Sequence, residues 1–272
     1  MEISLETLVE YFEDSADSTV SAREKSEQCR DYYDGIQLTE AEVSELTRRK
    51  QPPVVFNRIQ PKVDFLLGTE RKMRTDPKAF PRTPTHDHAA DAVTDGIRYV
   101  CDNNNFDVLS SDVFENELIE GMGGVSVEVD PETLEIKLKR FAWDRYFYDP
   151  HSRERNHSDS RYDGIVLWMD FEEAKERWPK SADGLGAMMT QATGLGETYD
   201  DKPNKWFDSK RKRVMIVQIN FIHMGVWNTA IYTKGSMLEA PKPIAYLDEF
   251  GKPENNFIAV SAKVTRGGDR YG

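Results

Sequence analysis

The chain has 272 residues, of which 38% are hydrophobic and 31% charged, and its formal net charge is -12. This length allows one large domain or two smaller ones, and the composition is that of a globular protein and not of a disordered chain. The negative charge argues against broad affinity for phosphate backbones, no stretch approaches the roughly 20 apolar residues of a membrane-spanning helix, and the acidic start is unlike a signal peptide. We therefore expect an intracellular protein that contacts no membrane.

Apolar residues at i, i+3, i+4 and i+7 spacing predict a first amphipathic helix over about 3–34, ended by Gly35. Thr39 and Glu42 form a capping box, in which each side chain accepts a hydrogen bond from a backbone amide of the first turn. A second helix therefore begins there, and Pro52-Pro53 stops it.

Asn57 is the expected N-cap of a third helix, which tolerates Pro61 because this proline lies in the first turn. The apolar positions of this helix are Ile59, Val63 and Leu67. A fourth helix is expected from about Asp87 to the asparagines at 103–105, and a fifth ends at Gly121.

Beyond Gly123-Gly124 the hydrophobic period changes from helical to alternating, which predicts a strand over about 125–129. Residues 130–133 have the composition of a turn, and alternation resumes over 134–138, so the two runs predict a β-hairpin. A third run at 145–148 is expected to extend the same sheet.

Further elements are predicted along the second half of the chain. These are a strand over 164–170, a short helix over 171–178, a partly mobile loop over 181–212, an antiparallel pair of strands over 214–223 and 229–233, and two short strands near Ala245 and Ile258. Helices followed by antiparallel strands, without a βαβ alternation, indicate an α+β fold. We expect a mainly helical part over 1–122 and a mainly antiparallel β part over 123–272.

Several residue groups have two interpretations. Gly121-Met122-Gly123-Gly124 has the composition of a phosphate loop, but such loops run from a strand into a helix, and here the order is reversed, so we interpret it as a helix exit. Cys29 and Cys101 lie outside any Cys-x-x-Cys spacing and are interpreted as reduced, packed thiols. The aromatic residues Trp143, Tyr146, Phe147 and Tyr148 could stack on bases, although a core is their commoner use.

Metal-ligand residue types occur at close spacing at His86, Asp87, His88 and Asp91. Asp87 is also suited to cap a helix, and no second cluster accompanies the group, so we expect no metal and no cofactor. His151 and His157 are interpreted as members of a solvated loop. No Gly-x-Ser-x-Gly elbow is present, and we predict no catalytic residue.

Basic residues form three clusters, and each lies near acidic residues. The clusters are Arg48, Arg49 and Lys50; Arg71, Lys72 and Arg74; and Lys210, Arg211, Lys212 and Arg213. We interpret them first as solvated faces or salt bridges between subunits and second as DNA contacts.

Six segments, taken in order, resemble the portal proteins of tailed double-stranded-DNA phages, in particular the large portals of the short-tailed type. The segments are 30–46 (RDYYDGIQLTEAEVSEL), 53–69 (PVVFNRIQPKVDFLLGT), 121–130 (GMGGVSVEVD), 143–150 (WDRYFYDP), 168–179 (WMDFEEAKERWP) and 247–272, which ends in RGGDRYG. Their order and spacing carry the resemblance, because no single segment is a strict signature.

This resemblance implies a structural subunit and not an enzyme. It implies a homo-oligomeric ring, commonly a dodecamer, at one capsid vertex, which contacts the capsid, docks the packaging terminase and later the tail proteins, and lets double-stranded DNA pass without sequence-specific binding. The present region would be the α+β wing, with the stem and clip expected to follow Gly272. The implied location is the virion, and the host cytoplasm during assembly.

Two alternative functions stay open at the level of sequence. One is a metal-dependent nuclease or other DNA-processing enzyme that uses His86, His88 and nearby carboxylates. The other is a DNA-binding module that uses the basic clusters, for which affinity should fall steeply with salt.

Overall fold

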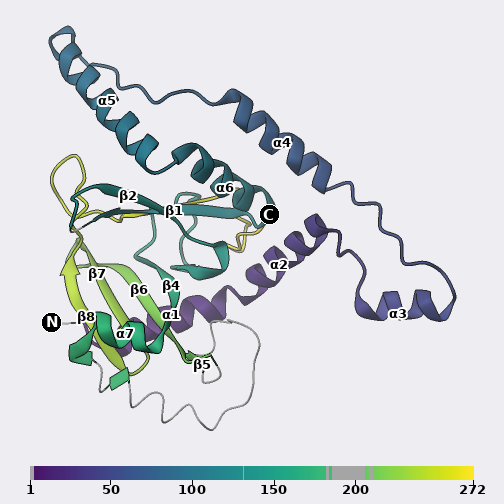
Figure 1. The fold of residues 1–272 in the computed structure, drawn as a ribbon. Helices are drawn as coiled ribbons and strands as arrows, with labels where there is room; N and C mark the ends of the chain where they lie inside the picture. Colours follow the sequence, from purple (N-terminus) through teal and green to yellow (C-terminus); the bar gives the residue numbers. More distant parts are fainter. Residues whose placement is uncertain (1–2, 131, 182–183, 186–205, 209–210) are drawn as a thin grey trace. The chain divides into compact units, whose positions relative to one another are not determined.

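The computed structural model of the chain describes residues 3–130, 132–181, 184–185, 206–208 and 211–272 (Figure 1). Helices dominate the first half and antiparallel strands the second, so the predicted α+β class is confirmed. The chain divides into two compact units. Unit 1 comprises residues 1–20 and 144–257, and unit 2 comprises 21–143 and 258–272.

The helix predicted over 3–34 is in fact two helices, α1 (Leu5–Ser18) and α2 (Val20–Asp34). The break falls at Thr19, whose hydroxyl donates to the carbonyl oxygen of Ser15 at 2.7 Å. A β-branched residue that bonds back to the preceding turn in this way disfavours a straight helix. The two helices belong to different units, which amphipathic spacing alone does not reveal.

Unit 1 is built on an antiparallel sheet with the order β3-β4-β6-β7-β8, and β5 also pairs with β6. The strands are β3 (Tyr146–Tyr148), β4 (Tyr162–Asp170), β5 (Phe207–Asp208), β6 (Arg213–His223), β7 (Val226–Thr233) and β8 (Ser236–Pro243). Helix α7 (Phe171–Arg177) follows β4. The 3-10 turn η2 (Trp143–Arg145) precedes β3, and the 3-10 turn η3 (Pro179–Ser181) follows α7. Val166 of β4 lies opposite Val217 of β6, and Ile219 lies opposite Ala230 of β7.

Strand β6 is buried on both faces, because a helix covers each side of the sheet. Leu8 and Phe12 of α1 pack in one core cluster with Val217, and α7 contributes Ala174 to a second cluster that contains Ile216. Neighbouring residues of a strand point to opposite faces, so the run Val214–Ile219 is almost continuously apolar.

Two predictions for this unit need correction. The run 145–148 joins the large sheet as β3 and does not extend the hairpin sheet. The strand expected near Ala245 is absent from the described residues there, and the fifth main strand is β8. Its prolines 241 and 243 conceal it in the sequence, but proline is tolerated in β8 because it is an edge strand.

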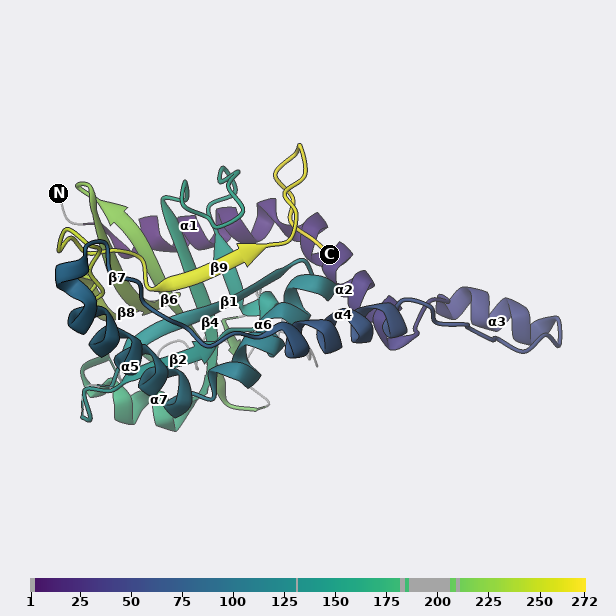
Figure 2. The same cartoon turned by 90° about the horizontal axis from the view of Figure 1, so that it is seen from above.

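Unit 2 contains a three-stranded sheet of order β2-β1-β9, with β1 (Met122–Val129), β2 (Ile136–Arg140) and β9 (Phe257–Ser261) (Figure 2). The predicted hairpin is confirmed, with Val127 opposite Leu138. Helix α6 (Phe106–Ile119) packs on this sheet. A side chain at Gly123 would approach the carbonyl oxygen of Val113 to 2.4 Å, so the glycine allows the close contact between helix and strand.

The remaining helices of unit 2 are α3 (Glu40–Arg48), α4 (Gln60–Met73) and α5 (Asp87–Asn103), with the 3-10 turn η1 (Pro84–His86) before α5. The capping box of Thr39 and Glu42 is confirmed. The side chain of Asn57 accepts hydrogen bonds from the amides of Ile59 and Gln60 at 3.0 and 3.3 Å. Asn57 therefore serves the first turn of α4, although helical geometry begins slightly later than predicted.

The change from helices to strands that was expected between residues 122 and 123 coincides with the start of β1 at Met122. The glycine segment lies between α6 and β1, which confirms the helix-exit interpretation, and Gly121 has a φ of +89°. As a domain boundary, the division between 1–122 and 123–272 stays a prediction.

Candidate subunit-contact surface

An arm formed by residues 36–59 connects α2 to α4 and is fixed at its base by side-chain hydrogen bonds. The side-chain amide of Asn57 donates to the carbonyl oxygen of Tyr33 at 2.7 Å. The hydroxyl of Tyr33 donates to Asp64 at 2.8 Å, and this bond raises the pKa of Tyr33 to about 12. The two ends of the arm are therefore held together at the junction of α2 and α4.

Helix α3 lies in the middle of this arm and contributes no buried residue. In Figures 1 and 2 it lies apart from the sheet and the other helices of unit 2. Short helices in water are marginal without packing, so α3 depends on its cap and on ion pairs along its own surface. The arm also exposes large apolar side chains to solvent, and Phe56 is 84% exposed.

Helix α4 is held against α6 by one face. Leu67 is buried on this face, and Glu70 and Arg74 follow at one-turn spacing, with 2.8 Å between Arg74 Nε and Glu70 Oε1. Ser111 of α6 donates to Glu70 at 2.7 Å, and Arg74 also contacts the hydroxyl of Ser111. The hydrogen bond from Arg74 lowers the pKa of Glu70, so the carboxylate is ionised where it joins the two helices.

A second face of α4 is exposed although it carries large apolar residues. Its members are Lys62, Phe65, Leu66, Lys72 and Met73, which we call the α4 face. Phe65 is 72% exposed and Met73 74% exposed. The spacing of these residues places them along one side of a helix. Contiguous apolar exposure of this kind is typical of protein interaction surfaces.

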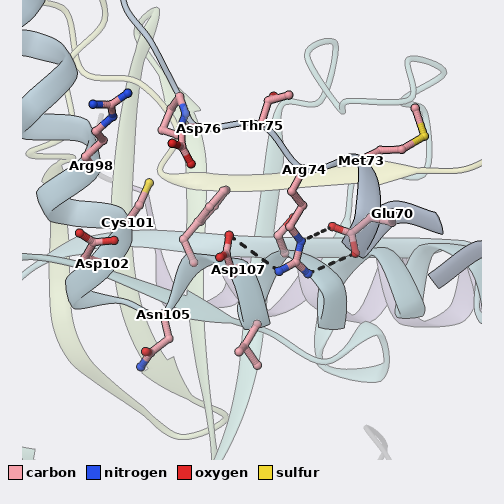
Figure 3. Close-up of a pocket in the computed structure, with 14 residues that line it drawn as sticks. Glu70, Met73, Arg74, Thr75, Asp76, Arg98, Cys101, Asp102, Asn105 and Asp107 are labelled. Carbon is pink, nitrogen blue, oxygen red and sulfur yellow. Dashed lines mark hydrogen bonds and ion pairs between the residues drawn. The ribbon is translucent and has the colours of Figure 1, made fainter. Parts of the chain in front are cut away.

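An open pocket of about 870 Å³ lies in unit 2 between the end of α4 and the junction of α5 with α6 (Figure 3). Its lining combines Met73 with the charged residues Arg98 and Asp102. Cys101 also lines the pocket, and burial raises the pKa of its thiol, which opposes formation of a nucleophilic thiolate.

The first two basic clusters lie on the arm and on α4. Arg48 and Arg49 both form ion pairs with Glu45, at 2.8 Å each, and Lys50 is exposed. The second cluster is divided by helix geometry, since Arg74 faces α6 while Arg71 and Lys72 are exposed. Arg48, Arg49 and Arg74 thus form ion pairs with acidic residues of the same chain. Salt bridges between subunits at these clusters stay a prediction.

The third cluster belongs to unit 1. Arg211 lies 4.0 Å from Asp208, and Arg213 lies 3.8 Å from Asp170. Lys212 has a positive φ of 51° next to the start of β6. Lys210 lies outside the described residues. Whether any of these residues contacts DNA or another subunit stays a proposal.

The proposed metal ligands are not gathered into a site by the described part of the chain. The Nδ1 atom of His86 lies 2.9 Å from the hydroxyl of Thr83. Within the described ranges, no group of three or more His, Cys, Asp and Glu side chains is arranged to hold a metal ion. The geometry therefore offers no support for a nuclease centre at His86 and His88.

The aromatic segment and the histidine loop of unit 1 are structural. Tyr146, Phe147 and Tyr148 are buried, which confirms the core interpretation. His157 is also buried, and its ring meets those of Tyr148 and Tyr146 edge-on at 4.9 and 5.6 Å. The prediction that His157 is solvated was wrong, because a dense polar sequence conceals the aromatic rings that cover it.

The α4 face was missed in the sequence. The pattern Ile59, Val63 and Leu67 predicts the apolar side of the helix and does not account for Phe65 and Leu66. The sequence does contain a signal for this face. The helix already has a complete apolar stripe, so two further large apolar residues outside it indicate a second contact surface.

An α+β chain with a hydrogen-bonded arm and an exposed apolar helix face has surface features that are typical of proteins that pack against other protein. A sequence model of the family described as "Phage P22-like portal protein" matches residues 9–224. The chain therefore belongs to the family of P22-like phage portal proteins, and its role is structural.

A named relative agrees with this assignment. The chain is similar to the portal protein of Helicobacter pylori bacteriophage KHP30, with 22% identity over 171 residues. This match covers 62% of the chain and 28% of the relative, so the chain spans under a third of that protein's length. Over the residues described, no helix combines the length and the hydrophobicity needed to cross a membrane.

Proposed function

We propose that the chain is a subunit of a closed homo-oligomeric ring at one capsid vertex, through which double-stranded DNA enters and leaves. The observation that carries this proposal is the α4 face, where Phe65, Leu66 and Met73 are exposed on a helix fixed in place by Glu70 and Arg74. In a ring, each such face would be covered by a neighbour. The net charge of -12 is suited to a conduit, because an acidic wall attracts DNA phosphates only weakly.

The partners of the whole assembly follow from the same proposal. The ring would contact the capsid shell, dock the packaging terminase and later the tail proteins, and reside in the virion after assembly in the host cytoplasm. Residues 1–122 and 123–272 would form the helical and β parts of its wing. The chain would act mechanically, without catalysis.

Native mass spectrometry and cryo-electron microscopy of the full-length protein test the ring. We expect one closed oligomer whose population changes with salt concentration. Salt screens both the repulsion between subunits of like net charge and the attraction between oppositely charged surfaces at their contacts. Monomers at every salt concentration would overturn the proposal.

The enzymatic and DNA-binding alternatives have separate tests. A metal-content assay and a DNA cleavage assay, on the native protein and on His88→Ala, are expected to show no bound metal and no cleavage. Cleavage that disappears in His88→Ala would favour the nuclease. Tight DNA binding that weakens steeply with salt would favour the DNA-binding module.

A further inference from the structure

Opposite charges are separated along unit 2. Residues 48–82 contain ten Lys and Arg and three Asp and Glu, for a net charge of +7, whereas residues 83–135 contain thirteen acidic residues and one arginine, for a net charge of -12. A chain with one basic and one acidic surface can pair with a copy of itself in a head-to-tail manner. Such a heterologous contact repeats and closes into a ring when the rotation permits.

The acidic surface contains an exposed face of α5. Like the α4 face, it combines charged and apolar side chains, but its charges are negative. His88, Asp91, Ala92, Asp95 and Tyr99 lie along one side of this helix, which we call the α5 face. Tyr99 is 58% exposed, and the only buried residue of α5 is Thr94. Helices α4 and α5 each contact α6, so each is anchored while these faces stay open.

The charges on the two faces lack partners within the described part of the chain. Neither Asp91 nor Asp95 forms an ion pair with a described residue, and the same holds for Lys62 and Lys72. Asp87, Asp91 and Asp95 stand four residues apart on one helix, and like charges at this spacing destabilise it. Cations from another molecule would remove that repulsion.

We infer that the α4 face of one subunit docks on the α5 face of the next copy in the ring. Lys62 and Lys72 would pair with Asp91 and Asp95, and Phe65, Leu66 and Met73 would pack against Tyr99 and Ala92. This inference rests on the proposed ring and names the surfaces that form it. DNA fits the α4 face less well, because phosphates would satisfy the two lysines and leave three large apolar side chains uncovered.

Charge reversal in the full-length protein tests the pairing. The variants Lys62→Glu/Lys72→Glu and Asp91→Lys/Asp95→Lys each place like charges opposite one another, so each is expected to raise the protein concentration needed for ring formation by more than about tenfold. Mixing the two purified variants should restore the ring, because every contact in an alternating ring is again between opposite charges. The quadruple variant should also assemble alone.

Arg71→Glu serves as the matched control for Lys72→Glu. It makes the same charge change at the neighbouring position, which lies outside the α4 face, and is expected to leave assembly unchanged. Circular dichroism should show that every variant is folded. Native mass spectrometry reports the oligomer in each case.

The outcomes separate this inference from the proposed function. Rings that form normally in both double variants would overturn the α4–α5 contact and leave the proposed ring intact. Absence of rings in the unmodified protein would overturn the ring itself. Normal rings together with weakened DNA binding in Lys62→Glu/Lys72→Glu would assign the α4 face to DNA and overturn the contact. Loss of assembly that mixing does not restore would also overturn it.

Discussion

Arg30 of α2 and Glu120 at the end of α6 form an ion pair in which the side chain of Glu120 is only 1% exposed and that of Arg30 is 30% exposed. Arg30 Nε donates to Glu120 Oε1 at 2.6 Å, and Arg30 also lies 3.2 Å from Glu115. Burial raises the pKa of Glu120, and the nearby guanidinium offsets part of this effect. The pair joins α2 to the end of α6 within unit 2, through two residues that are 90 positions apart in sequence.

We predict that Arg30→Ala destabilises the protein by about 2 kcal/mol, because it leaves a buried carboxylate without its cation. The matched control is Arg48→Ala, which removes an arginine whose ion pair with Glu45 is solvent-exposed. That change should leave stability within the error of the measurement. Urea unfolding checks both, and equal losses in the two variants would contradict the importance of burial.

Gly121 is expected to tolerate no side chain. Its φ is +89°, and an added Cβ would lie 2.1 Å from the carbonyl carbon of Tyr271. Gly121→Ala should therefore lower stability by more than about 2 kcal/mol. At Gly96 in α5, an added Cβ would meet nothing within 4 Å outside the helix's own backbone, so Gly96→Ala should be neutral or slightly stabilising. Thermal denaturation compares the two, and similar melting temperatures would contradict the prediction.

The capping box should control α3 locally. Thr39→Ala removes the hydroxyl that accepts from the amide of Glu42, which weakens the helix by about 1 kcal/mol. Because α3 has no buried residue, its amides should exchange faster while global stability stays the same. Hydrogen exchange measured by mass spectrometry resolves this difference.

Thr47→Ala is the control for that experiment. The hydroxyl of Thr47 donates to the carbonyl oxygen of Val43 in the same helix, which adds nothing to the N-terminal cap. Exchange in α3 should not accelerate in this variant. If both threonine variants behaved alike, the cap would not be the stabilising feature.

Asp163 of β4 makes stability depend on pH. It accepts hydrogen bonds from the hydroxyl of Tyr146 at 2.9 Å and the side-chain amide of Asn255 at 2.6 Å. Its second oxygen has no partner among the described residues, and burial raises the pKa of Asp163 to about 7 from an ordinary value of 3.8. Between these two pH values the folded state keeps a proton that the unfolded state releases, so this group's contribution to stability falls as pH rises.

Asp163→Asn removes that titration. From about pH 4 to pH 7 the native protein should therefore lose stability relative to the variant, and above pH 7 the difference between their unfolding free energies should stay constant. Urea unfolding across this range measures the difference, and the exposed Asp17→Asn serves as the surface control. A difference that is constant with pH would contradict the role of Asp163.

Local sequence features determined much of the fold. The cap at Thr39, the exit at Gly121 and the alternation on both sides of 130–133 each act over a few residues, so they predicted α3, the end of α6 and the β1-β2 hairpin. The aromatic composition of the run 146–148 also favours a core position, and the burial of its three residues confirms this prediction. The order of the matching segments was enough to indicate the portal family.

Only the tertiary structure decided which side chains are covered. Phe65 and Leu67 are both apolar residues of α4, yet one is exposed and the other buried, because α6 packs on one side of the helix alone. His157 lies in a polar segment but is enclosed by tyrosine rings, and Pro241 is tolerated because β8 is an edge strand. Burial depends on partners that arrive from distant parts of the chain, and hydrophobic periodicity does not specify those partners.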